Sequence, residues 1–256
     1  MKKIVKSYTY KILGLKKYLR LLYRLLAIAL DSGFLKNNAT FSLHYFTGKI
    51  IQEGDHVLDI GANLGYYTRL YMKTVGTKGK VYAVEPVKPF FDTISYFLGN
   101  KKNLVLYNYA LGIEEKEIQL SVPNQYGYLR TGLPSVYDKT SAQKEENLML
   151  FPAKMVKAST LFKDIERLDY LKMDVEGYER YIIPEMIDFL QKTLSCIQIE
   201  IDKDSKEIIE RTFLDMCYEA YYYTENKLTK NPVEGYAQDH FFIHPSKKER
   251  YQNLII

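Results

Sequence analysis

The segment VLDIGANLGYYT, residues 57–68, constrains the fold more than any other part of the chain. It joins a short apolar run to a turn with two glycines, and a helical pattern over 63–75 follows directly. At such a turn the first amides of the helix have no internal partners and can bind an anion. The segment therefore predicts a strand–turn–helix unit of an α/β protein, with an anion-binding turn at the carboxyl end of the strand.

The rest of the chain repeats this alternation, which is typical of parallel strands with crossover helices. We predict a Rossmann-like sheet of seven strands, at 56–60, 80–84, 103–110, 169–174, 195–201, 217–224 and 239–245. A short polar connection joins the last two strands, so we expect the last strand to run antiparallel. Between about 117 and 158 the alternation breaks, and two β segments with a long loop predict an insertion over one end of the sheet.

Basic side chains are concentrated near the start of the chain. The formal net charge is +5, but residues 1–24 hold eight lysines and arginines and no acid. The remaining residues carry 28 basic and 31 acidic side chains, a net charge of −3. A body of that sign is a poor match for a nucleic-acid groove, so we expect no nucleic-acid partner.

Residues 1–38 are predicted to form a basic amphipathic helical arm, separate from a main domain at 39–256. Over 13–30 the two faces of the helix carry Leu15, Leu19, Leu22 and Leu26 on one side and Lys16, Lys17, Arg20 and Arg24 on the other. The longest charge-free apolar run is far shorter than the ~20 residues that span a bilayer. The arm would cap the core, pair with a second copy in a homodimer, or lie with residues 1–30 in an anionic membrane surface, with Tyr18 and Tyr23 near the interface.

The two cysteines, Cys196 and Cys217, lie in apolar segments and show no CxxC spacing. They indicate a reducing compartment and no zinc site. No small-residue cleavage site follows the first apolar run, so no signal peptide is expected. We therefore expect a cytoplasmic protein, or one held peripherally on the inner face of the membrane.

Glu85 ends the second predicted strand, 20 residues after Gly65, where an acid can accept both ribose hydroxyls of a nucleoside. A dinucleotide site would have a middle glycine where this chain has Asn63, and the Gly-Lys-Ser/Thr of a triphosphate loop is absent. S-adenosylmethionine, a nucleoside with a short charged tail, matches a site that has an acid for the ribose and a glycine turn but no pattern for a dinucleotide or a triphosphate. Its carboxylate would bind the amides of the turn, and its ammonium would bind Asp59. Alternatively, the glycines only satisfy the backbone geometry of a tight turn.

Five segments together resemble the FkbM-type methyltransferases: DIGANLGYYT, VEP, the ALG after the third strand, STLFKD and KMDVEGYE. The resemblance covers about residues 53–202. It implies a class I fold and methyl transfer from S-adenosylmethionine, mostly to hydroxyls of sugars or polyketides. STLFKD departs from the family pattern, with Phe162 where Asp is more common. The resemblance implies these cofactor contacts: Asp59, Gly61, Asn63, Gly65 and Thr68 with the methionine part, Glu85 with the ribose, Asn108 to Leu111 (including Ala110) with the adenine, and Asp174 near the sulfonium.

The predicted catalytic residues are Asp174, Glu176 and His240. Asp174 would orient the acceptor or the cofactor's ammonium, and Glu176 would accept the hydroxyl proton, unless one or both only cap the next helix. Histidine is the other natural base. His240 opens the last strand, whose start we expect away from the carboxyl edge, and His44 lies on a helix that could fold over the cofactor. No third ligand accompanies the two carboxylates, so no metal is predicted.

The insertion holds aromatic and basic residues that suit a sugar, namely Tyr126, Tyr128, Arg130 and Tyr137. We therefore expect O-methylation of a hydroxyl on a sugar, glycan, glycolipid or related secondary metabolite. One alternative is a methyltransferase that acts on protein or nucleic acid. Another is a non-catalytic S-adenosylmethionine-binding scaffold, attached to a membrane through its basic arm.

Overall fold

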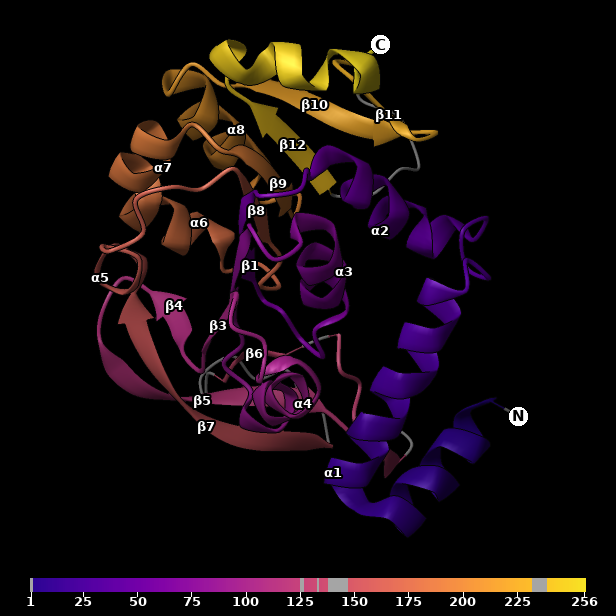
Figure 1. Ribbon diagram of the computed structural model, residues 1–256. Helices are drawn as coiled ribbons and strands as arrows, with labels where there is room; N and C mark the ends of the chain where they lie inside the picture. The colour runs from indigo at the N-terminus through magenta and orange to yellow at the C-terminus, as the bar shows by residue number, and fades with distance from the viewer. Residues whose placement is uncertain (1, 125–126, 133, 138–146, 232–238) are drawn as a thin grey trace.

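A mixed sheet of eight strands forms the centre of the molecule (Figure 1). The computed structural model describes residues 2–124, 127–132, 134–137, 147–231 and 239–256. Across the sheet lie, in order, β11 (Lys227–Thr229), β10 (Glu219–Thr224), β12 (Asp239–Ile243), β9 (Cys196–Glu200), β8 (Tyr170–Met173), β1 (His56–Ile60), β2 (Lys80–Val84) and β3 (Leu104–Tyr107). The strands from β9 to β3 are parallel, and β12 is antiparallel to both of its neighbours, as predicted.

Helices cover both faces of this sheet (Figure 1). They are α2 (Ala39–Ile50), α3 (Tyr66–Val75), α4 (Lys88–Leu98), α5 (Ala158–Leu161), α6 (Glu179–Ile182), α7 (Ile187–Thr193) and α8 (Lys206–Asp215), with the 3-10 helices η2 (Ile183–Met186) and η3 (Pro245–Leu254). Successive residues of β1 point to opposite faces. Val57 packs in a cluster with Tyr71 of α3, whereas Leu58 packs in a cluster with Phe213 of α8. Both faces of β1 are therefore buried, which explains its nearly continuous apolar run.

The apolar run at 103–110 is divided between two sheets. Its first part is β3, which ends at Tyr107. Asn108 then turns back, and its Nδ2 donates to the carbonyls of Glu85 and Pro86. Ala110 begins β4 (Ala110–Gly112) in the second sheet, so the prediction of one long third strand is wrong.

Two further details of the main layer differ from the predictions. The helix predicted over 178–190 is divided into α6, η2 and α7, with Pro184 at the first division, in the first turn of η2. Proline has no N–H and interrupts the helical hydrogen bonds. The eighth strand, β11, is three residues long and pairs with β10 through Tyr222 and Thr229. It is too short to give a strand pattern in the sequence.

A second sheet lies beside the main one, in the order β4, β7 (Leu148–Lys157), β5 (Lys116–Pro123) and β6 (Ser135–Val136). β5 and β7 pair antiparallel over the whole length of β5. This sheet is the predicted β excursion. Its residues Leu120, Ser135 and Val136 reach the functional site described below.

The N-terminal helix α1 (Lys2–Asp31) runs along the edge of the molecule and bends at Gly14, whose φ is +68° (Figure 1). After the bend it buries Tyr18, Leu19 and Tyr23, and the ring of Tyr23 stacks on Phe97 with centroids 4.2 Å apart. The expectation that Tyr18 and Tyr23 lie near a membrane interface is therefore wrong, because both pack into the protein. In the described part of the chain, no helix has the length and apolarity needed to cross a membrane.

Candidate functional site

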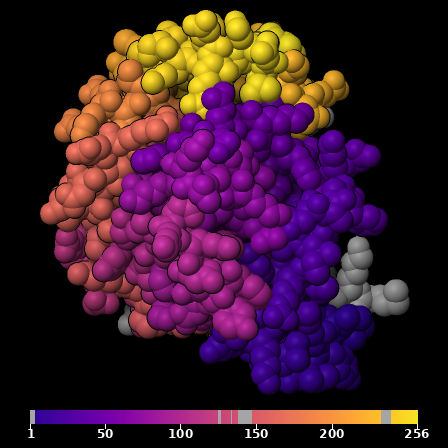
Figure 2. Space-filling model, in the orientation of Figure 1, coloured from indigo at the N-terminus to yellow at the C-terminus, as the bar shows by residue number. Residues whose placement is uncertain are grey.

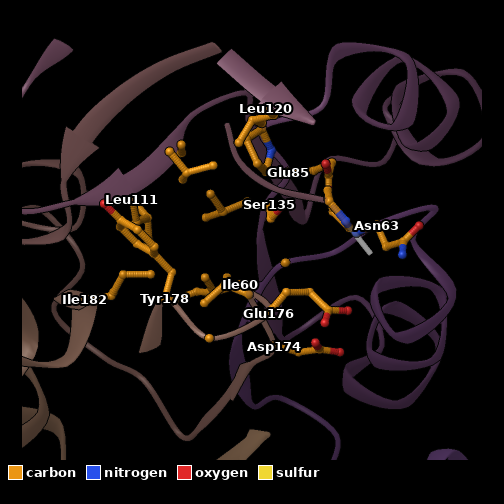
Figure 3. Close-up of a pocket in the computed structure, with 18 of the residues that line it drawn as sticks. Ile60, Asn63, Glu85, Leu111, Leu120, Ser135, Asp174, Glu176, Tyr178 and Ile182 are labelled. Carbon is orange, nitrogen blue, oxygen red and sulfur yellow. The ribbon is translucent and has the colours of Figure 1, made fainter. Parts of the chain in front are cut away.

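A cavity of about 400 Å³ opens at the carboxyl ends of β1, β2 and β8. Residues that follow these strands line it, among them Gly61, Glu85 and Asp174. Figure 3 shows the polar side chains of Asn63, Glu85, Asp174 and Glu176 on one side, and Leu111, Tyr178 and Ile182 on the other. Ligands of open α/β sheets bind at this edge, so the cavity is the candidate site.

The turn after β1 passes very close to the end of β8. A Cβ atom on Gly61, whose φ is +80°, would lie 1.8 Å from the carbonyl oxygen of Asp174. Only glycine fits there. Asn63 also has a positive φ, of 54°, and its Nδ2 donates to Thr131 O at 2.6 Å. The turn is therefore held from both β8 and the loop that precedes β6.

The amides of this turn are used within the protein. Those of Gly61 and Ala62 donate to Val84 O, and that of Gly65 donates to Ala62 O. The amide of Asn63 donates to Glu85 Oε2 at 2.7 Å. The expectation that these amides bind a carboxylate is therefore wrong. An anion would instead meet the first amides of α3, which begins at Tyr66.

Glu85 connects two βα turns and faces the cavity. Its Oε1 accepts from the amide of Val87 at 2.7 Å, while Oε2 accepts from Asn63. Burial raises the pKa of Glu85 to about 8, although these two hydrogen bonds act in the opposite direction. Each carboxyl oxygen has two lone pairs. Glu85 can therefore hold both turns and still accept hydrogen bonds from a ligand.

Lys172 and Asp174 form an ion pair beside the cavity, in which Lys172 is buried and the side chain of Asp174 is 32% exposed. Lys172 is 4% exposed, and its Nζ lies 2.9 Å from Asp174 Oδ2. Burial disfavours the charge on Lys172, but the carboxylates of Asp174 and Asp59 raise its pKa above the ordinary value. Burial likewise opposes ionisation of Asp174, but the Lys172 ammonium lowers the pKa of Asp174. Both partners are therefore charged at neutral pH.

Glu200, the last residue of β9, lies beside this pair. Burial and the charge of Asp174 raise the pKa of Glu200 to about 8, and the two carboxyl groups hydrogen-bond to each other. Near neutral pH Glu200 therefore keeps its proton and donates a hydrogen bond to the charged carboxylate of Asp174. In the next strand Asp239 pairs with Glu200 in register, and its Oδ1 accepts from Gln198 Nε2 at 2.7 Å.

Glu176 lies on the cavity next to Asp174, and the two carboxyl groups point the same way in Figure 3. Its φ is +54°, and Gly177 follows with a φ of +92°. Loss of hydration in the cavity wall, together with the charges of Asp174 and Glu179, raises the pKa of Glu176 to about 7. It is Glu179 that accepts from the amide of Val175, at 2.9 Å, and no side chain caps α6 at its N-cap. This geometry leaves Glu176 directed at the cavity rather than at the helix.

The structure divides the predicted cofactor residues into two groups. Gly61, Asn63, Glu85, Ala110 and Asp174 line the cavity, and the others, Asp59, Gly65, Thr68 and Asn108, do not.

The residues outside the lining support it from behind. Asp59 and Thr68 are completely buried and bonded to each other, with Thr68 Oγ1 donating to Asp59 Oδ2 at 2.6 Å. Gly65 is the N-cap residue of α3, and Asn108 holds the end of β2 as described above. These four residues therefore support the cavity wall and do not contact a ligand in the cavity directly.

The histidines do not reach the cavity. Because β12 runs antiparallel, its first residue pairs with Glu200 at the carboxyl edge, so our expectation for the start of that strand is wrong. His240 nevertheless points to α8, where its Nε2 lies 3.3 Å from Glu210 Oε1. His44 packs against Tyr67, and burial lowers the pKa of His44 to about 4. We therefore no longer assign a catalytic role to His240.

The aromatic wall of the cavity combines Tyr109, from the predicted adenine segment 108–111, with two tyrosines that we did not select from the sequence, Tyr178 and Tyr181. Arg180 lines the cavity together with them. The rings of Tyr178 and Tyr181 lie 4.8 Å apart. The Tyr-x-x-Tyr sequence directly after KMDVEG was the available signal, because it places both rings on one helical turn.

The aromatic residues that we did select in the insertion are placed elsewhere. Tyr128 packs on the arm, with Lys6 Nζ 5.6 Å from its ring centroid, and it does not line the cavity. Arg130 and Tyr137 are also absent from the lining, and Tyr126 lies outside the described residues.

The residues present fit S-adenosylmethionine. A buried acid ends β2, a glycine turn admits a ligand close to the backbone, and apolar residues flank the position expected for a base. One buried oxygen of the cavity lining, Asn63 Oδ1, has no hydrogen-bond partner among the described residues. A ligand or a water would supply the donor that this oxygen lacks.

Comparison with protein families gives one assignment. The model of the Methyltransferase FkbM domain matches residues 59–223, which is more than half of the chain. The match includes the glycine turn, Glu85 and the Asp174–Glu176 segment.

Comparison with individual proteins gives more distant relatives. The chain is 30% identical over 112 residues to the ribosomal RNA large subunit methyltransferase E of Buchnera aphidicola, and the match spans 40% of this chain and about half (49%) of that one. Among solved structures, a methyltransferase FkbM from Methylobacillus flagellatus is 11% identical, with a TM-score of 0.49 over 75% of this chain and 44% of that chain. A SAM-dependent O-methyltransferase from Thermotoga maritima is 14% identical, with a TM-score of 0.43 over 79% and 64%.

Proposed function

This chain belongs to the Methyltransferase FkbM domain family, and on that premise we propose that it methylates a hydroxyl group of a sugar, glycan, glycolipid or related secondary metabolite. Family membership makes it an S-adenosylmethionine-dependent methyltransferase. The acceptor class is our inference from the cavity. The observation that carries it is a carboxylate with a pKa of about 7, Glu176, that faces a cavity walled by tyrosines.

The cavity would hold S-adenosylmethionine along the carboxyl edge of the sheet. Glu85 would accept hydrogen bonds from the ribose, and Tyr109, Ala110 and Leu111 would flank the base. The ion pair of Lys172 and Asp174 places a fixed negative charge near the methionine end. When bound, the cofactor supplies the methyl group as an electrophile.

Glu176 is the proposed general base. A sugar hydroxyl is a weak nucleophile at neutral pH, so a group that accepts its proton accelerates transfer. A base works best when its pKa lies near the working pH, and Glu176 meets this condition. Lys172 keeps Asp174 charged by lowering the pKa of its carboxyl group. A proton that Glu176 accepts therefore does not pass on to Asp174. We propose Asp174 as the residue that orients the acceptor or the cofactor's ammonium.

The rest of the cavity suits a sugar ring. Tyr178 and Tyr181 offer aromatic faces and hydroxyls, which pack on the apolar side of a pyranose and bond to its polar edge. Arg180 lies at the same wall and donates to the hydroxyl of Tyr181 at 2.9 Å. A guanidinium there would favour an acceptor that carries a carboxylate or phosphate.

A second candidate acceptor is ribosomal RNA, on which the relative from Buchnera aphidicola acts by name. A 2′-hydroxyl would suit the same base. Against it, the chain after residue 24 has a net charge of −3, and a groove for RNA needs basic residues. We therefore rank the sugar acceptor first.

Transfer of labelled methyl to a set of acceptors tests the proposal. The set contains a sugar nucleotide, a lipid-linked oligosaccharide, a free polysaccharide and a ribosomal RNA transcript, each with the wild type, Glu176→Gln and the surface control Glu207→Gln. We expect label on a sugar acceptor with the wild type and the control, and little with Glu176→Gln. Label on RNA alone would overturn the sugar proposal and leave the methyltransferase assignment intact.

We propose the cytoplasm as the compartment. Cys196 and Cys217 are both free in the structure, which supports a reducing environment. Labelling of both thiols after lysis directly into denaturant, without prior reduction, is the corresponding measurement, because Cys196 is buried in the folded protein. A mixed disulfide on either thiol would contradict the assignment.

A further inference from the structure

The first part of α1, before the bend at Gly14, carries an apolar stripe that faces solvent. Its residues are Ile4, Val5, Tyr8 and Ile12, and each side chain is 60–79% exposed. Ile4, Tyr8 and Ile12 recur every four residues, and Val5 lies beside them, so the four side chains share one helical face. We call these four residues the outer stripe. In Figure 2 the indigo N-terminal segment stands out at the lower right of the molecule.

The opposite face of the same helix is fixed to the protein. Tyr10 and Leu13 pack with the cluster that contains Tyr18, and the rings of Tyr10 and Tyr18 meet edge to face at 5.2 Å. The hydroxyl of Tyr10 also lies 3.6 Å from Met149 Sδ in β7. Because this inner face is anchored on the arm's second part and on the second sheet, the outer stripe cannot turn inward without breaking these contacts.

The charge around the outer stripe is of one sign. No acid occurs before Asp31, whereas eight lysines and arginines do. Lys11, which lies next to Ile12, and Lys17, after the bend, are exposed. An apolar stripe with basic flanks and no acid is complementary to a surface that combines negative charge with an apolar layer beneath it. A membrane with anionic lipids is such a surface, and it attracts each nearby lysine or arginine.

We propose that the outer stripe docks the protein on an anionic lipid surface. Ile4, Val5, Tyr8 and Ile12 enter the region between headgroups and acyl chains, and Lys11 contacts lipid phosphates. The stripe lies before the bend, whereas Leu15, Leu19 and Leu22 after the bend pack into the protein's own core. The docking is independent of which acceptor the enzyme methylates.

Flotation of the full-length chain with vesicles tests this. The vesicles are phosphatidylcholine alone, or phosphatidylcholine with about one third phosphatidylglycerol. The variant Ile4→Asp/Ile12→Asp removes the stripe. Its matched control is Ile208→Asp/Leu214→Asp on α8, where the side chains are 59% and 57% exposed. We expect binding only to the anionic vesicles, about tenfold weaker for the stripe variant and unchanged for the control.

A second pair of variants separates the contribution of charge. Lys11→Glu/Lys17→Glu keeps the stripe, and Lys101→Glu/Lys102→Glu makes the same charge change on exposed residues remote from it in sequence. We expect the first to weaken binding to anionic vesicles about tenfold and the second to leave it nearly unchanged. Added salt should weaken the wild type in the same way.

Three outcomes would overturn the proposal. The first is no binding of the wild type to anionic vesicles. The second is an equal loss for the stripe variant and its control. The third is a wild-type dimer in solution that Ile4→Asp/Ile12→Asp converts to a monomer without any effect on vesicle binding, because the stripe would then cover a second copy of the chain.

Discussion

Lys172 Nζ donates a 2.9 Å hydrogen bond to the carboxylate of Asp174, two residues further along the same chain. Side chains two apart in a strand point to the same face. The pair therefore places a buried positive charge and a partly exposed negative charge where β8 ends and the cavity begins. Lys172 also lies 4.7 Å from the ring centroid of Tyr67, which covers it from the side of α3.

Replacement of Lys172 by methionine should be destabilising. It leaves the carboxylate of Asp174 without its partner. Loss of one partner of a fully buried ion pair costs about 3–5 kcal/mol, and the cost here should be smaller because the Asp174 side chain is 32% exposed. The double variant Lys172→Met/Asp174→Asn should recover part of that loss, because the carboxylate of Asp174 is then gone, while Asp59 still lacks the ammonium that faces it. Urea unfolding of both variants and the wild type provides the measurement. Equal stability of the two variants would show that the pair's charge is not what matters.

The pH dependence of methyl transfer should follow Glu176. A base acts only when deprotonated, so kcat/KM should rise with pH and level off above about 7. Glu176→Gln should lower kcat by about 10²–10⁴ and remove the rising limb, while the affinity for S-adenosylmethionine changes little. A variant that keeps both the rate and the rising limb would remove Glu176 from the role of base.

Glu85 should decide cofactor binding. Glu85→Ala removes the acceptor for the amides of Asn63 and Val87 as well as for the ribose, and each unpaired buried amide costs about 1–3 kcal/mol. We expect calorimetry to show at least a tenfold weaker affinity for S-adenosylmethionine and S-adenosylhomocysteine, with no heat from NAD in any variant. Glu85→Gln, which keeps one acceptor oxygen, should lose less. Binding of NAD by the wild type would contradict the assignment of the turn.

Gly61 should tolerate no side chain. In Gly61→Ala the new Cβ would meet the carbonyl oxygen of Asp174, which belongs to the backbone and cannot move aside. Gly54→Ala is the matched control, since Gly54 has a φ of +87° and nothing within 4 Å of the added atom. We expect about 1 kcal/mol of destabilisation for the control and at least about 3 kcal/mol more for Gly61→Ala. Similar thermal stability of the two would mean that the turn can move away from β8.

Stability without ligand should fall as the pH rises through the neutral range. The pKa of Glu200 is about 8 in the folded protein, above its ordinary value of 4.5, so the folded state holds more protons between these values. The contribution of Glu200 to stability is then fully present below about 4.5 and is lost progressively up to about 8. Glu200→Gln should make this fall shallower, whereas Glu207→Gln on the surface should not. Glu85 acts in the same direction, so some of the fall should remain.

Local patterns were enough to predict most of the main sheet. The apolar runs that became β1, β2, β8 and β9 are buried on both faces, and the glycine turn could lie only at the end of a strand. The cavity-lining residues Gly61, Asn63, Glu85, Asp174 and Glu176 could be predicted because each directly follows or ends one of these strands.

The remaining features depend on contacts between distant segments. The side chain of Asn108 ends β3 by bonding to the segment after β2, and no local pattern announces that bond. The turn's amides are occupied by Val84 and Glu85 across the sheet, so the sequence suggests a freer anion site than the structure has. The prediction for His240 was wrong because successive side chains of β12 point to opposite faces of the sheet. The side chain of His240 points to α8 rather than to the cavity.

Leu120 of β5 belongs both to the cluster that Tyr18 and Leu19 of the arm enter and to the lining of the cavity. A substitution at Leu19 that changes the volume behind Leu120 would therefore alter the shape of this wall of the cavity without changing any residue that lines it. The cavity can accordingly be reshaped from residues outside its lining. A library confined to the buried face of α1 would vary the proposed acceptor site while leaving Glu85 and Glu176 unchanged.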